Sequence, residues 1–107
     1  MTTLAVLTTV DSLEQARAIA SALVERKLAA CVQISTIESF YTWEGAVQND
    51  PEFRLLVKTT DERYTDVEAA ICELHPYELP AIVALNASRV FEPFAAWVAE
   101  NSAGNGD

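Results

Sequence analysis

Residues 28–60 read LAACVQISTIESFYTWEGAVQNDPEFRLLVKTT, and this stretch decides the fold. No helix signal interrupts it from residue 28 to about residue 42, so we expect a long strand there. Residues 43–46 (Trp-Glu-Gly-Ala) predict a reversal of the chain, with Gly45 supplying the flexible position. A third strand follows the reversal. The stretch therefore predicts a long two-stranded hairpin.

The returning strand carries a second break signal at residues 49–51 (Asn-Asp-Pro). Beyond this break, residues 52–60 alternate as a strand does. One face of that strand is expected to carry Phe53, Leu55 and Val57, and the other face Arg54, Leu56 and Lys58.

A strand and a helix are expected before the hairpin. Residues 2–10 are rich in Val, Leu and Thr and alternate loosely, which is typical of a strand. Asp11 and Ser12 then open a helix, with Ser12 and Gln15 at the spacing of a capping box. The apolar helix face that we expect on the sheet consists of Leu13, Ala16, Ala20, Leu23 and Val24.

After the hairpin the same pattern repeats. A helix is expected from about Asp61, and it should end before Pro76, which disfavours helical geometry at the preceding residue. Its apolar face is formed by Tyr64, Val67, Ile71 and Leu74. The loop HPYELP (75–80) leads to a short strand at 82–85. A final helix is marked by Phe91, Phe94 and Val98, with Pro93 tolerated in its first turn.

This order of elements predicts an α+β fold, the ferredoxin-like split βαβ sandwich with an extra C-terminal helix. Residues 1–107 form one domain, and residues 102–107 (SAGNGD) are expected to be a frayed tail. Right-handed crossovers place both long helices on one face of an antiparallel sheet, which leaves the other face uncovered.

The hairpin is expected to be too long for the domain. A strand of roughly 15 residues spans about 50 Å, whereas a globule of this length has a diameter of roughly 34 Å. The projecting ribbon carries Phe40, Tyr41 and Trp43 near its tip. A bare two-stranded ribbon is marginal in water, so we expect other copies of the chain to cover it in a closed oligomer. These three aromatic residues are our predicted interface.

Composition excludes several classes of partner. The chain has 107 residues, 50 % of them hydrophobic, and a formal net charge of −9. That charge has the wrong sign for phosphates or anionic lipids, so neither nucleic acid nor a membrane is expected as a partner. The longest apolar run is far shorter than the ~20 residues of a membrane span, and no basic segment leads an apolar signal core. We therefore expect a cytoplasmic protein.

The cysteines and the single histidine limit the chemistry. Cys31 and Cys72 lie in apolar contexts and are expected to be buried free thiols rather than a disulfide. One chain has too few Cys and His residues for a closed zinc site. His75 is the only imidazole, and neither an activated nucleophile nor an acid–base pair can be named. We do not expect an enzyme.

Four features nevertheless indicate a polar site, and each also has a simpler interpretation. Lys58 is either a positioned cation or a solvated strand residue. His75 is either a ligand contact or a residue that favours the helix C-terminus. The prolines of HPYELP either present Tyr77 and Glu78 or only stiffen a turn. Cys31 is either a ligand or part of the core.

The segments LAACVQI, FYTWEG, LVKTTDE and HPYELP, in this order, resemble the CutA family of divalent-cation tolerance proteins. The resemblance extends from about residue 3 to residue 101. It implies a ferredoxin-like homotrimer whose long second and third strands pair across subunits, and the binding of copper or another divalent cation. The corresponding family positions are Cys31, Tyr41, Trp43, Gly45, Glu52, Lys58, His75, Pro76, Tyr77, Glu78 and Pro80.

The chain departs from the family pattern at three positions. Ala46 stands where the family often has a basic residue, Ala81 where it usually has an acid, and Phe94 where it often has Tyr. These departures leave a metal role largely to Cys31, His75 and Glu78.

Three functions follow from the resemblance. The first is a metal-response protein that binds copper through Cys31, His75 and Glu78. The second is a signalling trimer that binds a small anion in a cleft between subunits, with Lys58 and His75 facing the anion and Trp43 or Tyr77 stacking on it. The third is an assembly scaffold. We favour the first. The residues expected to bind a ligand in the cleft between subunits are Cys31, Trp43, Lys58, His75, Tyr77 and Glu78.

Overall fold

The computed structural model describes residues 2–104. Its elements follow the predicted order of strand, helix, strand, strand, helix, strand and helix. They are β1 (Thr3–Val10), α1 (Leu13–Glu25), β2 (Cys31–Trp43), β3 (Ala46–Thr60), a 3₁₀ turn (Asp61–Arg63), α2 (Tyr64–Leu74), β4 (Val83–Asn86) and α3 (Glu92–Asn101).

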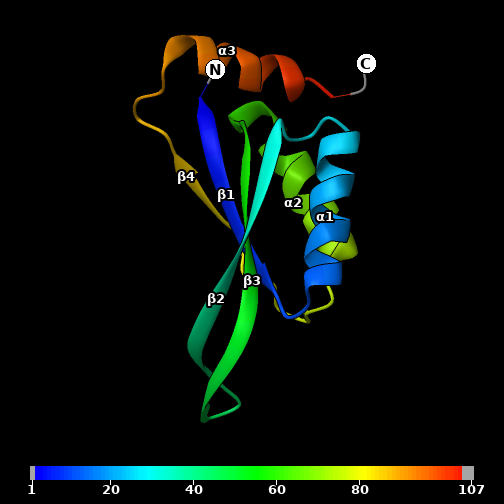
Figure 1. Ribbon diagram of the computed structural model, residues 1–107, viewed down its shortest axis with the longest axis vertical. Helices are drawn as coiled ribbons and strands as arrows, with labels where there is room; N and C mark the ends of the chain where they lie inside the picture. The colour runs from blue at the N-terminus through cyan, green and yellow to red at the C-terminus, as the bar shows by residue number, and fades with distance from the viewer. Residues whose placement is uncertain (1, 105–107) are drawn as a thin grey trace.

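The four strands form one antiparallel sheet in the order β2-β3-β1-β4. β3 lies between β1 and β2, so α1 makes a split βαβ crossover. α1 and α2 lie side by side on one face of the sheet (Figure 1). The predicted fold class is confirmed.

The core lies between that face and the two helices. Leu4, Val6 and Val10 alternate along β1 and are at most 4 % exposed. The helices contribute Ala16, Ile19, Leu23, Val67, Ala70 and Ile71 to the same cluster. On α1 the buried face differs from our prediction, because Ile19 lies in it whereas Leu13 and Val24 are exposed. The residues that pack, 16, 19, 20 and 23, keep the spacing of one helix face.

The opposite face of the sheet is open over much of its area. Leu85, Ala5, Lys58 and Cys31 form one row across the four strands. In the next row, Val83 is 51 % exposed, and Leu85 in the first row is 52 % exposed. α3 lies across the end of the sheet where β1 begins (Figure 1), and the Lys58 Nζ atom lies 5.5 Å from the centroid of the Phe94 ring.

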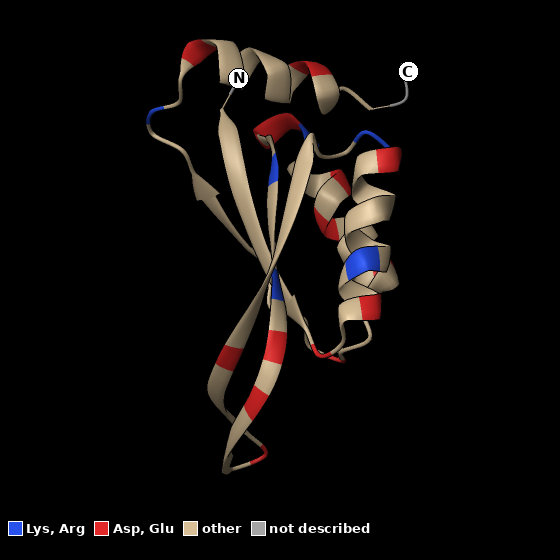
Figure 2. Cartoon of the chain, viewed as in Figure 1, with Lys and Arg blue, Asp and Glu red and all other residues tan. Residues whose placement is uncertain are grey.

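The β2–β3 hairpin projects well beyond the domain. The last pair between β1 and β3 is Val10 with Phe53, so residues 37–52 extend past the rest of the sheet (Figure 1). The chain measures 44 × 27 × 20 Å. The projecting part contains acidic residues and no Lys or Arg (Figure 2). The predicted overhang is confirmed, although β2 has 13 residues rather than the expected 15 or so.

The predicted break at residues 49–51 is wrong, because β3 runs through it without interruption. Pro51 lies opposite Glu38 in the ladder with β2. Among the strands of residues 2–104, the part of β3 before Phe53 pairs with β2 alone. Such an edge segment tolerates the loss of the N–H group that proline lacks.

Two further expectations need correction. Ser102 is 2 % exposed and the Gly104 N–H donates to the Lys27 carbonyl at 2.9 Å, so residues 102–104 are packed rather than frayed; residues 105–107 lie outside the described residues. Both cysteines are free, as predicted, but neither is buried: Cys72 is exposed on α2 and Cys31 is half-buried.

Within residues 2–104, no helix is both long and apolar enough to cross a membrane.

Candidate functional site

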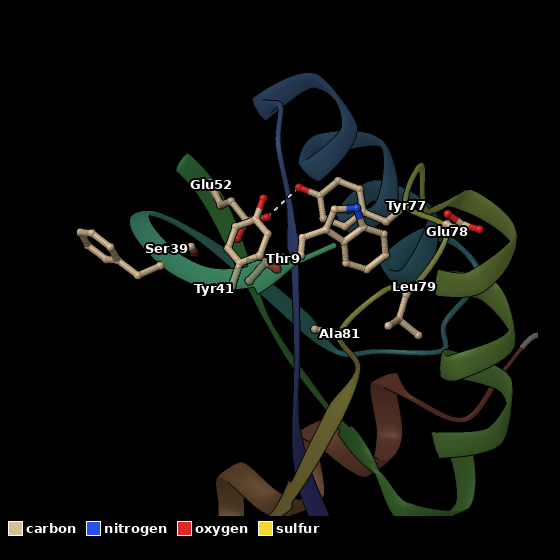
Figure 3. Close-up of a pocket in the computed structure, with 10 residues that line it drawn as sticks. Thr9, Ser39, Tyr41, Glu52, Tyr77, Glu78, Leu79 and Ala81 are labelled. Atoms are coloured by element: carbon tan, nitrogen blue, oxygen red, sulfur yellow. Dashed lines mark hydrogen bonds between the residues drawn. The ribbon is translucent and has the colours of Figure 1, made fainter. Parts of the chain in front are cut away.

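A cavity of about 600 Å³ lies between the base of the projecting hairpin and the loop that follows α2 (Figure 3). β1, β2 and β3 form one side of this cavity, and the 77–81 loop forms the other. The residues that line it are Thr9, Ser39, Phe40, Tyr41, Trp43, Glu52, Tyr77, Glu78, Leu79 and Ala81.

Strand register explains how the hairpin residues meet there. Thr9 lies opposite Arg54 on the sheet face that α1 and α2 leave open. Glu52 comes two residues before Arg54 in β3, so it lies on the same face. Ile37 lies opposite Glu52, so every second residue of β2 from Ile37 to Trp43 shares this face. Apart from Phe40, which the alternation places on the other face, the hairpin residues that line the cavity therefore share one side of the hairpin.

The other wall depends on the end of α2. Because Pro76 disfavours helical geometry at the residue before it, His75 is extended with φ −78° and ψ 135°, and α2 ends at Leu74 as predicted. The loop then turns back toward β1, which brings Tyr77 to the cavity.

Glu52 and Tyr77 form the closest polar contact of the cavity. The Tyr77 hydroxyl donates to Glu52 Oε2 at 2.6 Å (Figure 3). Glu52 is only 7 % exposed. Burial, followed by the hydrogen bond and the charge of Glu52, raises the pKa of Tyr77 well above its ordinary value. Tyr77 therefore stays protonated at neutral pH and donates to the carboxylate.

His75 holds this loop in place. Its Nε2 atom lies 2.8 Å from the Thr9 carbonyl oxygen, and its Nδ1 atom lies 3.1 Å from the backbone nitrogen of Tyr77. A carbonyl only accepts and an amide N–H only donates, so Nε2 carries the proton and Nδ1 accepts. Burial lowers the pKa of His75, against the opposing effects of the Thr9 carbonyl, Asp11 and Glu52. The imidazole is neutral, with both nitrogens engaged.

The predicted site residues separate into two groups. Trp43, Tyr77 and Glu78 line the cavity, and His75 supports it from behind. Cys31 and Lys58 lie opposite each other at the far end of the same face, in the row of Ala5.

Ala5 is four residues from Thr9, which is about 13 Å along the strand. Within residues 2–104, no three His, Cys, Asp or Glu side chains are grouped so that they could hold a metal ion. Neither the predicted metal ligands nor the predicted anion contacts converge within one chain.

Sequence reasoning missed part of the cavity. Thr9 accepts a hydrogen bond from His75 through its backbone carbonyl, and it lines the cavity wall. In the sequence, nothing distinguishes it from an ordinary strand residue. Leu79 lines the opposite wall and is 72 % exposed. Of the departures from the family pattern, Ala81 lies in the cavity, where Glu52 and Glu78 are the acidic lining residues among residues 2–104. Phe94 stacks on Trp97 with ring centroids 5.7 Å apart.

The family model described as CutA1 divalent ion tolerance protein matches residues 4–101. The chain belongs to the CutA1 family. Among its relatives is the Divalent-cation tolerance protein CutA of Thermus thermophilus, which is 46 % identical over 98 residues, or 91 % of this chain and 95 % of the relative. The Archaeoglobus fulgidus protein of the same name is 41 % identical over 92 residues, or 86 % and 90 % of the two chains.

Solved CutA1 structures share the fold. The Thermus thermophilus protein superposes with a TM-score of 0.90 at 44 % identity, covering 94 % of this chain and 98 % of the other. The Archaeoglobus fulgidus structure has a TM-score of 0.91 at 38 % identity, covering 95 % and 99 %.

The expected cytoplasmic location is corrected by one of these CutA1 relatives. The Archaeoglobus fulgidus structure is described as a periplasmic divalent cation tolerance protein. Our expectation rested on charge and on the lack of a signal-like segment, and neither property determines the compartment in which a folded domain works.

Proposed function

We propose that this protein acts in divalent-cation tolerance as a homotrimer, without catalysing a reaction, and that it binds copper or another divalent cation through Cys31. Membership of the CutA1 family supports the general role. Two relatives that cover nearly the whole chain carry the name Divalent-cation tolerance protein.

The open sheet face is the observation that carries the trimer. Val83 and Leu85 are about half exposed there, and Phe40 on the projecting hairpin is 69 % exposed. Covering such apolar surface stabilises an assembly by about 25 cal/mol per Å². A closed ring of three copies also gives the projecting strands a neighbour, which a single chain does not.

The metal proposal rests on Cys31 rather than on the whole predicted set. The half-buried Cys31 thiol lies on the open face, where assembly would bring residues of neighbouring copies near it. A thiolate suits copper, but one thiolate is too few ligands for tight binding. His75 has both nitrogens in hydrogen bonds, and Glu78 lies at the other end of the face. Binding should therefore require assembly.

Cys72 provides a matched control, because it is also a free cysteine but is exposed on α2. We would titrate copper(I) against a competing chelator into the wild-type protein, Cys31→Ser and Cys72→Ser. We expect Cys31→Ser to lose at least about tenfold in affinity while Cys72→Ser retains it. Equal copper affinity in all three proteins would remove Cys31 from the site and favour the assembly scaffold.

The small-anion alternative is not favoured by the cavity. No Lys or Arg is among the residues that line it, whereas Glu52 and Glu78 are. Lys58 lies at the far end of the sheet face, beneath Phe94. An anion would meet repulsion here rather than a counter-ion.

A further inference from the structure

We propose that Arg54 orients the copies of this chain in their assembly. Its guanidinium group, on the open sheet face, binds the Asp50 carboxylate on the projecting hairpin of a neighbouring copy. The partner of this surface is thus a second copy of the chain, placed with its hairpin on its neighbour's domain. This inference rests on the proposed trimer, to which it adds a named contact and a direction.

The open face of the sheet is divided by charge. On its domain part, the charged residues of the described strands are Arg54 and Lys58, and no Asp or Glu lies between or beside them. On its projecting part they are Asp50 and Glu52, without Lys or Arg (Figure 2). Such a surface is complementary to a second copy that is shifted along the strands, and complementary charges fix the register of a contact.

Arg54 has no counter-charge within the described part of its own chain. Its side chain is exposed, and the two ion pairs of residues 2–104 do not involve it. Lys58, the other basic residue of this face, already lies over the Phe94 ring, with its Nζ atom 5.5 Å from the ring centroid. Arg54 is therefore the basic residue of the face that is left to pair with a neighbour.

Assembly on this face makes a partner for Arg54 necessary. Thr9 and Ser35 lie opposite Arg54 on the two neighbouring strands, so covering the face would enclose the guanidinium among uncharged side chains. A buried charge is costly unless an opposite charge and hydrogen bonds accompany it. The missing negative charge must therefore belong to the molecule that covers the face.

Asp50 is the acid best placed to supply that charge. It comes four residues before Arg54 in β3, about 13 Å along the strand, so the two side chains do not meet within one copy. Glu52 is nearer, but it is buried and accepts a hydrogen bond from Tyr77. Asp50 is exposed, and the Tyr41 hydroxyl donates to its Oδ2 atom at 2.8 Å. The carboxylate is thus held on the open face, in a form that a guanidinium can bind through two parallel hydrogen bonds.

The pair also gives the assembly a direction. Arg54 belongs to the domain part of the face and Asp50 to the hairpin part, so each copy would use one patch toward the copy before it and the other toward the copy after it. Head-to-tail contacts of this kind close into a ring when the rotation between copies permits. A cavity of about 200 Å³ beside Arg54, lined in part by Leu7, Gln33 and Leu56, leaves room for side chains of the arriving hairpin.

Exchanging the two charges tests the pair. We would prepare Arg54→Glu, Asp50→Arg and the double variant, and follow subunit exchange between unlabelled and ¹⁵N-labelled copies by native mass spectrometry, which also gives the mass of each assembly. Arg17→Glu is the matched control for the first change, because Arg17 is exposed on α1, away from the open face. Glu38→Arg combined with Arg54→Glu is the matched control for rescue, because Glu38 lies opposite Pro51 on the other face of the hairpin.

We expect Arg54→Glu and Asp50→Arg each to speed subunit exchange by about tenfold or more, because two like charges then face each other between copies. The double variant should return to within about threefold of the wild-type rate, since it restores an opposite pair. Arg17→Glu should exchange at the wild-type rate, and Glu38→Arg should not rescue Arg54→Glu. If Arg54→Glu does not fold, Arg54→Gln, which only removes the positive charge, should still speed exchange by about threefold or more.

Two results would overturn the pair while leaving the trimer in place. One is a wild-type rate of exchange in Arg54→Glu or, where that variant does not fold, in Arg54→Gln. The other is a double variant that exchanges as fast as Arg54→Glu. In either case the wild-type mass would still be three times that of one chain, and another group would face Arg54. A wild-type mass of 11.7 kDa would instead overturn the proposed trimer and this inference together.

Discussion

At the scale of single residues, the contact between Tyr77 and Glu52 matters most. It joins the loop after α2 to the base of the hairpin, segments 25 positions apart in sequence. One partner is a carboxylate that is almost fully buried. Removing the hydroxyl would leave that carboxylate with no hydrogen-bond donor among the described residues.

We predict that Tyr77→Phe lowers the free energy of unfolding by about 1–3 kcal/mol, the cost of an unsatisfied buried polar group. Tyr64→Phe is the matched control, because the Tyr64 hydroxyl donates to the exposed Glu68 at 2.8 Å. An exposed pair of this kind contributes no more than about 0.5 kcal/mol. Urea denaturation of both variants at equal protein concentration measures the difference, and equal losses would contradict the importance of burial.

His75 makes stability depend on pH in a predictable direction. Burial lowers the pKa of His75 in the folded chain below its ordinary value of 6.5. As the pH falls below 6.5, the unfolded chain takes up a proton that the folded chain does not. Stability is thus complete above that pH and is lost below it, because protonated Nδ1 no longer accepts the Tyr77 N–H.

The chain has one histidine, so the effect can be isolated. As the pH falls below 6.5, the unfolding temperature of the wild-type protein should decrease more steeply than that of His75→Gln. Parallel pH profiles for the two proteins would show that His75 is not held in its neutral form.

At the scale of elements, the hairpin turn is tight and specific. Glu44 and Gly45 have φ values of +49° and +79°, as the two central residues of a type I′ turn require. Such a turn suits the twist of the flanking strands. Glutamate is an unfavourable residue at a positive φ, whereas Asn followed by Gly is the preferred pair.

We therefore predict opposite effects for two substitutions in the turn. Glu44→Asn should stabilise the protein by a few tenths of a kcal/mol up to about 1 kcal/mol, because Asn tolerates the left-handed conformation. Gly45→Ala should destabilise it by about 1–2 kcal/mol from backbone strain alone, since an added Cβ atom meets nothing within 4 Å. Thermal unfolding measures both, and a gain in stability from Gly45→Ala would contradict this conformation of the turn.

The elements also show what the sequence can and cannot predict. Periodicity and Pro76 correctly placed α2 and its end, because both act through local geometry. Pro51 misled the analysis, because a local break signal does not tell whether a strand has a second neighbour. For the site, Trp43 and Tyr77, which the sequence analysis singled out, line one cavity. Cys31 and Trp43 are the two ends of β2, so the length of that strand separates them. That Tyr77 meets Glu52 depends on the path of the loop after α2, which no local pattern in the sequence specifies.

At the scale of the whole molecule, the open face of the sheet predicts the effect of a charge placed on it. Val83→Asp should dissociate the proposed trimer, because a carboxylate would then be buried between copies without a partner. Val24 is a matched control: it is 42 % exposed, similar to the 51 % of Val83, but lies on α1. Val24→Asp should leave the mass in solution unchanged. Equal masses for the two variants would show that the interface between copies does not lie on this face.

The trimer is the claim on which the proposed metal site depends, and its mass in solution tests it most directly. We predict that sedimentation equilibrium of the wild-type protein gives about 35 kDa, three times the 11.7 kDa of one chain, and that this value holds on dilution. A stable species of 11.7 kDa would contradict the account, because the open sheet face and the projecting hairpin would then be stable in water without a second copy.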